Sequence, residues 1–174
     1  MWLQSNINEH MKSLLLIRHA KSSWDNPMQN DFDRPLNARG LKDAPMMAQR
    51  LLDRKIKIDA FFSSPAIRAK QTCSLFMQAF KVDETIMQLQ SQLYLAAPDV
   101  LMQTIISMPT SISSAAIFSH NNGITEFANT LTSTGIDNMP TCSVFAVKAD
   151  TDNWKDFAKA KKEFWFFDYP KLQP

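Results

Sequence analysis

The chain has 174 residues and a mass of 19.8 kDa, which fits one domain of ordinary size with a substantial core. Hydrophobic residues make up 45% and charged residues 21%, with only 3 Gly, so the composition excludes a disordered, collagen-like or low-complexity chain. A formal net charge of +2 is too small for bulk electrostatic binding of nucleic acid or a membrane, and we expect neither as a partner. Any functional positive charge must therefore be local.

The start of the chain and its cysteines indicate the compartment. Residues 1–10 lack the basic start and apolar stretch of a signal peptide, and no later segment approaches the ~18 apolar residues of a membrane span. Cys73 and Cys142 lie far apart without Cys-x-x-Cys spacing, which favours free thiols in the core. We expect a cytoplasmic protein with a polar N-terminal tail at residues 1–12 and a single domain at residues 13–174.

The first predicted strand and helix are separated by a long polar segment. A buried strand is predicted at residues 13–17, and the segment 21–37 that follows is long enough to be a functional loop. Asn37 is a plausible N-cap of a helix that runs to about Arg54. Because proline removes a backbone donor, Pro45 predicts a kink or a later start of this helix.

The order of strand, turn and helix then repeats. Residues 58–63 predict a second strand, and residues 66–80 predict a helix opened by a first-turn proline, Pro65. Further along we expect a short strand at 86–89, a helix at 98–107, a strand at 115–118, and a helix to about Leu131 capped by Asn121 or Asn122. This alternation predicts an α/β fold with three layers, α/β/α, around a mostly parallel central sheet.

The C-terminal part has a different pattern. Residues 143–147 and 164–167 are two β-runs on either side of the turn-forming residues 150–153, which predicts a β-hairpin-like edge to the sheet. The aromatic run 164–167 is better explained by an edge strand packed beneath a helix than by a membrane or partner surface.

Polar residues follow three of the predicted strands at their carboxyl ends. They are Arg18 and His19, then Ser63 and Ser64 followed by Arg68, and finally Ser119 and His120. In open α/β sheets this edge binds ligands, so two histidines and at least two arginines are expected to converge there. Arginine offers a fork of donors that matches phosphate oxygens, and neutral imidazole can attack phosphorus. The sequence therefore indicates a site for a phosphoryl group, without a P-loop or an obvious magnesium motif.

Four segments in order resemble the motifs of a known family. They are Leu15–Trp24, which contains the Arg-His pair, then Arg34–Gly40, Ser63–Thr72 and Phe118–Ile124. These segments resemble the histidine phosphatase superfamily, and in particular its SixA-type phosphohistidine phosphatase branch, in which Ala20 is a familiar replacement for glycine. The resemblance implies a phosphoglycerate mutase-like fold and a hydrolase that acts on a phosphorylated protein or a small phosphorylated molecule.

The resemblance also implies roles for individual residues. His19 would be the nucleophile that forms a covalent phosphohistidine, and Arg18, Arg68 and His120 would complete the catalytic group. Arg18, Arg34, Arg68 and His120 would bind the phosphate. Hydrolysis would proceed in two steps, with no metal and no other cofactor.

One departure from the superfamily pattern concerns the general acid. Many members place a carboxylic acid after the third motif, where this chain has glutamines within residues 88–94; Glu84 and Asp99 are alternatives without a motif. A protonated phosphohistidine already has a good leaving nitrogen, which favours a phosphohistidine substrate. The alternatives are a small-molecule phosphomonoesterase or mutase of the same superfamily, and a catalytically weak module that binds phosphorylated ligands.

The sequence allows more than one role for each of three side chains, and it does not determine the oligomeric state. Trp24 either shapes substrate access or is a partly buried core aromatic. The loop that carries Arg34 could place this side chain on the surface instead of in the site. His10 falls in the expected tail, so we do not expect it to complete a metal site with His19 and His120.

Overall fold

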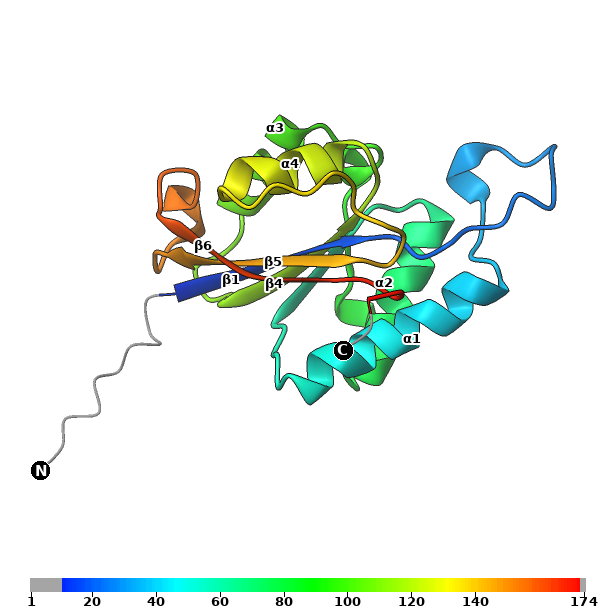
Figure 1. Ribbon diagram of the computed structural model, residues 1–174, viewed down its shortest axis with the longest axis horizontal. Coiled ribbons are helices and arrows are strands. Elements are labelled where there is room, and N and C mark those ends of the chain that lie inside the picture. The colour runs from blue at the N-terminus through cyan, green and yellow to red at the C-terminus, as the bar shows by residue number, and fades with distance from the viewer. Residues whose placement is uncertain (1–10, 173–174) are drawn as a thin grey trace, which may run out of the picture.

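The central sheet contains six strands in the order β3-β2-β4-β1-β5-β6, within the residues 11–172 that this computed structural model describes (Figure 1). Strands β3, β2, β4 and β1 run parallel, and β5 and β6 continue the sheet antiparallel. The strands are β1 (Met11–Arg18), β2 (Ala60–Ser63), β3 (Gln88–Leu89), β4 (Ser114–Ser119), β5 (Val144–Asp150) and β6 (Lys162–Asp168). The mostly parallel sheet and its antiparallel C-terminal edge are confirmed.

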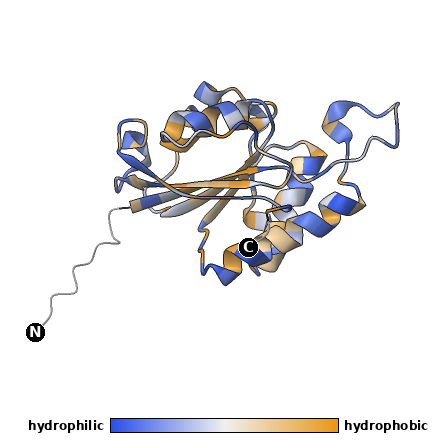
Figure 2. Ribbon diagram, in the orientation of Figure 1, coloured by the Kyte–Doolittle hydropathy of each residue, from blue (hydrophilic) through white to orange (hydrophobic). Residues whose placement is uncertain are grey.

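Helices cover both faces of the sheet, which confirms the three-layer arrangement. Helices α1 (Ala38–Asp53) and α2 (Ile67–Ala79) lie on one face, and α3 (Pro98–Ile106) and α4 (Gly123–Leu131) lie on the other (Figure 1). The connections contain short 3-10 helices: η1 (Asp31–Asp33), η2 (Glu84–Ile86), η3 (Ser91–Leu93) and η4 (Trp154–Asp156). The helices are banded in hydropathy along their length in Figure 2, because one side of each meets the sheet and the other meets solvent.

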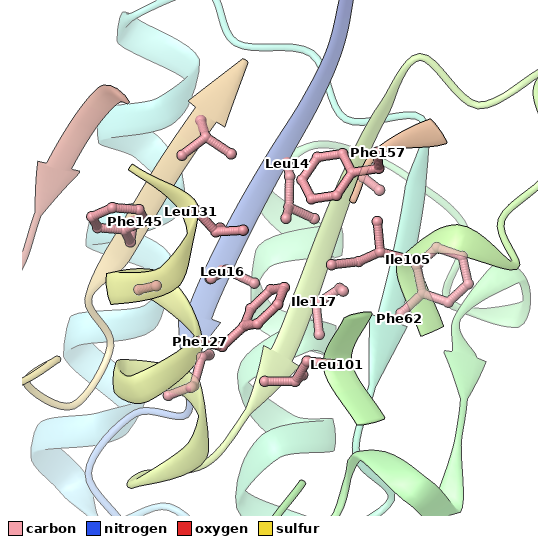
Figure 3. Packing of buried hydrophobic residues seen from close by; sticks show 14 of the residues in the cluster. Leu14, Leu16, Phe62, Leu101, Ile105, Ile117, Phe127, Leu131, Phe145 and Phe157 are labelled. Carbon is pink, nitrogen blue, oxygen red and sulfur yellow. The ribbon is translucent and has the colours of Figure 1, made fainter. Parts of the chain in front are cut away.

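Alternate side chains of β1 divide the core into two halves. Leu14 and Leu16 belong to the cluster under α3 and α4, where Figure 3 shows Leu16 near Phe127 and Leu14 near Phe157. Leu15 and Ile17 belong to the cluster under α1 and α2. Successive side chains of a strand point to opposite faces, and helices cover both faces here, so the whole apolar run is buried.

The first strand begins two residues earlier than expected. It includes Met11 and Lys12, and the buried amine of Lys12 donates hydrogen bonds to the carbonyls of Thr110 at 2.6 Å and Ile112 at 2.8 Å. The remaining residues of the expected tail, 1–10, lie outside the described residues.

The helix α1 begins at Ala38, and the expected later start is wrong. The side chain of Asn37 accepts a hydrogen bond from the backbone N–H of Gly40 at 3.0 Å, as an N-cap should. The helix then continues through Pro45, which is exposed and interrupts only one backbone hydrogen bond.

Two details at other helix starts also differ from expectation. Pro65 precedes the N-cap residue Ala66 and is therefore outside the first turn of α2. Asn122 occupies the N-cap position of α4, but its side chain makes no capping hydrogen bond. The neighbouring Asn121 instead accepts a hydrogen bond from the Thr125 hydroxyl at 2.7 Å. A side-chain cap at this helix is thus a wrong prediction.

The remaining structural expectations concern the C-terminal edge, the thiols and the membrane. Strands β5 and β6 pair antiparallel, and the edge strand β6 contains the run 164–167. Cys73 and Cys142 are both buried and free, as expected. Within residues 11–172, none of the helices has the length and apolar character needed to cross a bilayer.

Candidate active site

Three parallel strands end side by side and bring two histidines together. Arg18 at the end of β1 pairs with Ser119 at the end of β4, so His19 and His120 follow at the same level of the sheet. Their ring centroids are 5.1 Å apart. Both side chains are buried. The predicted convergence at the carboxyl edge of the sheet is therefore present.

The hydrogen bonds of His19 define which ring nitrogen is free of a proton. Its Nδ1 lies 2.7 Å from the carbonyl oxygen of Ala20, which can only accept, so Nδ1 carries the hydrogen. Its Nε2 lies 3.2 Å from Nε of Arg68, which can only donate, so Nε2 presents its lone pair. The ring is held as the tautomer whose Nε2 can act as a nucleophile.

The surroundings of His19 also disfavour its protonation. Burial lowers the pKa of this imidazole to about 3, and the neighbouring His120, Arg68 and Arg18 act in the same direction. The hydrogen bond to the Ala20 carbonyl opposes them but does not outweigh them. The ring is consequently neutral at physiological pH.

His120 faces the same space with one ring nitrogen unengaged. Its Nε2 lies 2.7 Å from the hydroxyl oxygen of Ser64, and its buried Nδ1 has no partner among the described residues. If the Ser64 hydroxyl donates to Nε2, the ring hydrogen is on Nδ1. Burial and the charges of Arg68 and Arg18 lower the pKa of His120 to about 3, against an opposite effect of Asp31. An arriving anion would raise this pKa and find a donor at Nδ1.

Arg18 supplies a partly buried positive charge beside the two histidines. Its Nη1 donates to the carbonyl of Met139 at 2.7 Å, whereas its buried Nε has no partner among the described residues. Burial, and then the like charge of Arg68, lower the pKa of Arg18. The two guanidinium groups repel each other, and an anion bound between them would relieve this repulsion. Arg18 and Arg68 therefore form a suitable site for an anion.

Arg68 connects this group to the loop between β1 and α1. Its Nη2 donates to the carboxylate of Asp31 at 2.8 Å, and its Nη1 donates to the backbone carbonyl of the same residue. The Tyr94 hydroxyl donates to the same carboxylate oxygen at 2.8 Å. Partial burial would raise the pKa of Asp31, but the hydrogen bonds from Tyr94, Arg68 and Arg34 hold it at about 2.

Arg34 is buried in the loop and does not contact the histidines. Its Nε donates to the Ser23 carbonyl at 3.0 Å, its Nη2 to the Ser22 hydroxyl at 2.6 Å and its Nη1 to Asp31 at 2.9 Å. Its guanidinium carbon lies 3.2 Å from the ring centroid of Trp24. The structure thus links Arg34 to the other site residues only through Asp31.

Trp24 and the two weighed carboxylates fall outside the site. Trp24 is 70% exposed, so its interpretation as a partly buried core aromatic is wrong. Glu84 is exposed in η2 and accepts a hydrogen bond from Gln78 at 2.8 Å, and Asp99 lies in the first turn of α3.

Asp31 and Tyr94 are site residues that the sequence did not single out, and Ser64 was expected only as a polar residue at the end of a strand, without a role. Ser64 stands in the third motif, four residues before Arg68, and Asp31 stands three residues before Arg34 in the polar segment. These short spacings from the predicted site residues Arg68 and Arg34 are the sequence signals that could have identified Ser64 and Asp31. Tyr94 had none beyond its place at the end of the glutamine-containing segment.

Two close contacts of the backbone link the segments that carry the site residues. The hydroxyl of Thr72 accepts from the backbone N–H of Ala20 at 2.9 Å and donates to the carbonyl of Arg68 at 2.6 Å, which ties the first motif to the third. A Cβ on Gly40 would lie 2.2 Å from the backbone oxygen of Lys21, so only glycine lets α1 approach the segment after β1 this closely.

No metal-binding cluster was predicted here. Within residues 11–172, no group of three or more His, Cys, Asp or Glu side chains is placed to hold a metal ion. His10 lies outside the described residues.

The chain belongs to the histidine phosphatase superfamily. The sequence model of its branch 1 matches residues 14–90. An uncharacterized chloroplastic protein of Arabidopsis thaliana is 32% identical over 153 residues, which cover 83% of this chain and 70% of that relative. A 2,3-bisphosphoglycerate-dependent phosphoglycerate mutase of Rhizobium meliloti is 37% identical over 71 residues, which cover 38% of this chain and 33% of the mutase.

Solved structures narrow the likeness to the SixA type of fold. The putative phosphohistidine phosphatase SixA from Agrobacterium tumefaciens is 25% identical, with a TM-score of 0.76 over 91% of this chain and 98% of that one. A protein histidine phosphatase SixA complexed with tungstate shares the fold at 18% identity, with a TM-score of 0.78 over 91% of this chain and 97% of the other. The family and this fold support phosphatase activity.

Proposed function

We propose that this protein is a metal-independent phosphohistidine phosphatase that works through a covalent intermediate on His19. The observation that carries the proposal is the state of this imidazole, whose unprotonated Nε2 stands beside Arg68 with Nδ1 fixed by the Ala20 carbonyl. An imidazole in this state is a ready nucleophile for phosphorus. Arg18, Arg68 and His120 surround it with the donors that a transferring phosphoryl group requires.

The reaction has two steps. In the first, a bond forms between phosphorus and Nε2 of His19 while the bond from phosphorus to the substrate breaks, and its electron pair leaves with the substrate group. In the second, water attacks phosphorus, the bond to His19 breaks, and inorganic phosphate is released. Arg18, Arg68 and His120 act in both steps by stabilising negative charge on the phosphoryl oxygens.

Arg34 is a further phosphate contact in this proposal, and its position sets a condition. Each of its nitrogens already donates to Ser22, Ser23 or Asp31. It therefore has only the second N–H groups of Nη1 and Nη2 to offer to a phosphate. Through these hydrogen bonds, Arg34 stabilises the loop that carries Asp31.

The nature of the SixA-like relatives supports phosphohistidine as the substrate. The Agrobacterium tumefaciens structure is described as a putative phosphohistidine phosphatase. A phosphoramidate protonated on its ring leaves without a strong general acid. Neither Glu84 nor Asp99 contacts the histidines or their arginines, which is consistent with such a substrate.

A trapping experiment tests the proposal. The protein is mixed with phosphohistidine in EDTA, the reaction is quenched, and mass spectrometry locates any adduct while released phosphate is assayed. We expect a phosphate adduct on His19 and continued release in EDTA. Full activity in His19→Ala would contradict the nucleophile. Tight phosphate binding with neither adduct nor release would favour a binding module instead.

The same assay on sugar phosphates separates the enzyme classes within the superfamily. The likeness to phosphoglycerate mutases covers only about a third of those enzymes, so a mutase or a small-molecule phosphomonoesterase is the second candidate. A preference for sugar phosphates over phosphoramidates would select it.

The domain organisation and location complete the proposal. We propose a single domain over residues 13–174, because all six described strands belong to one sheet, and a cytoplasmic location. Limited proteolysis tests the first, and cell fractionation with an antibody tests the second.

A further inference from the structure

The loop between β1 and α1 brings a carboxylate to the guanidinium group that stands beside His19. Asp31 binds Nη2 of Arg68 at 2.8 Å through one oxygen and Nη1 of Arg34 at 2.9 Å through the other. Arg68 is only 3% exposed at its side chain, whereas Asp31 is 43% exposed. The carboxylate is thus the solvent-exposed partner of a buried guanidinium group.

An aromatic wall joins this carboxylate to the second histidine. The ring of Tyr94 meets that of His120 edge to face, with centroids 5.4 Å apart. The ring of Phe32, the next residue after Asp31, meets Tyr94 in the same way at 5.1 Å. The Tyr94 hydroxyl donates to Asp31. A carboxylate bordered by aromatic rings suits a flat ring with an N–H group.

The charge of Asp31 restricts what it can do. Two arginines and a phenol donate to it, so it is an acceptor and not a proton donor at neutral pH. A phosphoryl group on Arg68 competes for the same donors and repels the carboxylate. Substrates with an anionic leaving group are repelled as well, whereas a cationic leaving group is attracted.

We propose that Asp31 and Tyr94 form a leaving-group subsite, in which Asp31 accepts a hydrogen bond from the ring nitrogen of phosphohistidine that is distal to phosphorus. This inference rests on the proposed function. It gives the site a preference for a protonated imidazole over an alcohol or a carboxylate-bearing group, and it assigns that preference to the loop containing η1.

With this contact, every bond, electron pair and proton of the first chemical step is accounted for. The substrate enters with a proton on its distal ring nitrogen, so the ring is cationic. The bond from phosphorus to the proximal nitrogen breaks, its electron pair returns to that nitrogen, and phosphorus bonds to Nε2 of His19. The leaving imidazole departs neutral and keeps its distal proton. Asp31 stays ionised throughout, so no separate general acid is needed.

The variant Asp31→Asn tests the subsite with two substrates. The values of kcat/KM are measured for phosphohistidine and for 4-nitrophenyl phosphate, whose leaving group has no N–H. We expect a fall of about tenfold or more for phosphohistidine, the size of one lost hydrogen bond to a charged group. We expect a smaller fall for 4-nitrophenyl phosphate, because this substrate has no N–H for the carboxylate to bind, so the ratio of the two kcat/KM values should fall. Tyr94→Phe should shift the ratio in the same direction by less.

A matched control lies on the same 3-10 helix. The carboxylate of Asp33 accepts from the side chain of Asn30 and contacts neither Arg68 nor Tyr94 in the hydrogen bonds and ion pairs described above. Asp33→Asn should leave the ratio of the two kcat/KM values unchanged.

Four outcomes overturn the subsite. An equal fall on both substrates would mean that Asp31 only positions Arg68, and an equal rise would mean that it only blocks the site. An unchanged ratio, with the wild-type protein active on phosphohistidine, would overturn the subsite and leave the proposed function intact. Failure of the wild-type protein to hydrolyse phosphohistidine would overturn the proposed substrate and the subsite with it.

Discussion

Nε of Arg68 lies 3.2 Å from Nε2 of His19, and this contact joins the third sequence motif to the first. A guanidinium group does not give up its proton, so the contact keeps Nε2 unprotonated, with its lone pair accepting a hydrogen bond from Arg68, and places a positive charge beside it. The same guanidinium group is then within reach of a phosphoryl group on that nitrogen. In the proposed reaction, Arg68 would therefore keep the nucleophile unprotonated and stabilise the negative charge of the phosphoryl group that is transferred to it.

Replacing Arg68 with lysine tests whether the shape of the guanidinium group matters. Lysine keeps the charge but loses the fork and the Nε donor, so we expect kcat to fall about a hundredfold, as for other lost oxyanion donors. Turnover of 4-nitrophenyl phosphate measures it. Arg54→Lys is the matched control, because Arg54 pairs with Asp168 away from the site. Similar rates for Arg68→Lys and the wild-type protein would contradict this role.

Arg34 and Trp24 stack closely but should differ in their effect on activity. Arg34→Ala removes hydrogen bonds to Ser22, Ser23 and Asp31, so we expect kcat/KM to fall about tenfold. Trp24→Ala removes one exposed cation–π contact, which is worth about 0.5–1 kcal/mol, and the change should stay within a few-fold. Steady-state kinetics of both variants decide. Equal losses would show that the stack, and not the hydrogen bonds, holds the loop.

The two buried histidines predict that acid destabilises the fold. Each has a pKa of about 3, against an ordinary value of 6.5, so the unfolded chain binds more protons between these values. Their contribution to stability is present above pH about 6.5 and is lost as the pH falls toward 3. We expect the free energy of unfolding to drop by up to about 1.4 kcal/mol per pH unit for each histidine. The pKa of Asp31 is lowered from 3.8 to about 2, so its contribution to stability is present above pH 3.8 and is lost only as the pH falls below that value.

Urea unfolding at about pH 7, 6 and 5 measures this dependence. His120→Gln should flatten it, since only His19 then titrates in that window. Equal stability of the wild-type protein at the three pH values would mean that neither histidine is held neutral by the fold.

Gly40 and Gly135 give a matched pair for the packing of α1. In Gly40→Ala the new Cβ would lie 2.2 Å from the Lys21 backbone oxygen, so we expect a loss of about 2 kcal/mol or more despite the better helix propensity of alanine. In Gly135→Ala the Cβ meets nothing within 4 Å, and the change should stay within about 0.5 kcal/mol. Thermal unfolding of the two variants compares them. A neutral Gly40→Ala would contradict the close approach.

The strands and most helices could be predicted because their signals are local. The apolar runs of β1 and β4 stop at polar residues, and this pattern sufficed to bring His19 and His120 to one edge of the sheet. The start of β1 was missed because Lys12 looks like a solvated residue, although its amine is held by carbonyls near residue 111, far along the chain.

The contacts of the loop before α1 could not be predicted from sequence. Asp31 binds Arg68 and Tyr94, which lie 37 and 63 residues away along the chain. A periodic pattern of hydrophobic residues does not reveal contacts between residues so far apart in sequence. The superfamily resemblance predicts a carboxylate after the third motif, whereas Asp31 precedes that motif in the chain. Arg34 was expected to bind a phosphate, and its hydrogen bonds to Ser22, Ser23 and Asp31 could not be predicted because they depend on the course of an irregular segment.

Both edges of the sheet are poor templates for a further strand. At one edge β3 contains only the 2 residues Gln88 and Leu89, so it offers few backbone groups for pairing. At the other, β6 opens with the charged residues Lys162 and Glu163, and the register of its pairing with β5 shifts between Ala146 and Val147. Short length, charge and irregular register are the means by which natural sheets avoid edge-to-edge aggregation. We therefore expect this protein to resist edge-to-edge aggregation at high concentration. The end of the sheet that carries the candidate active site would then stay accessible.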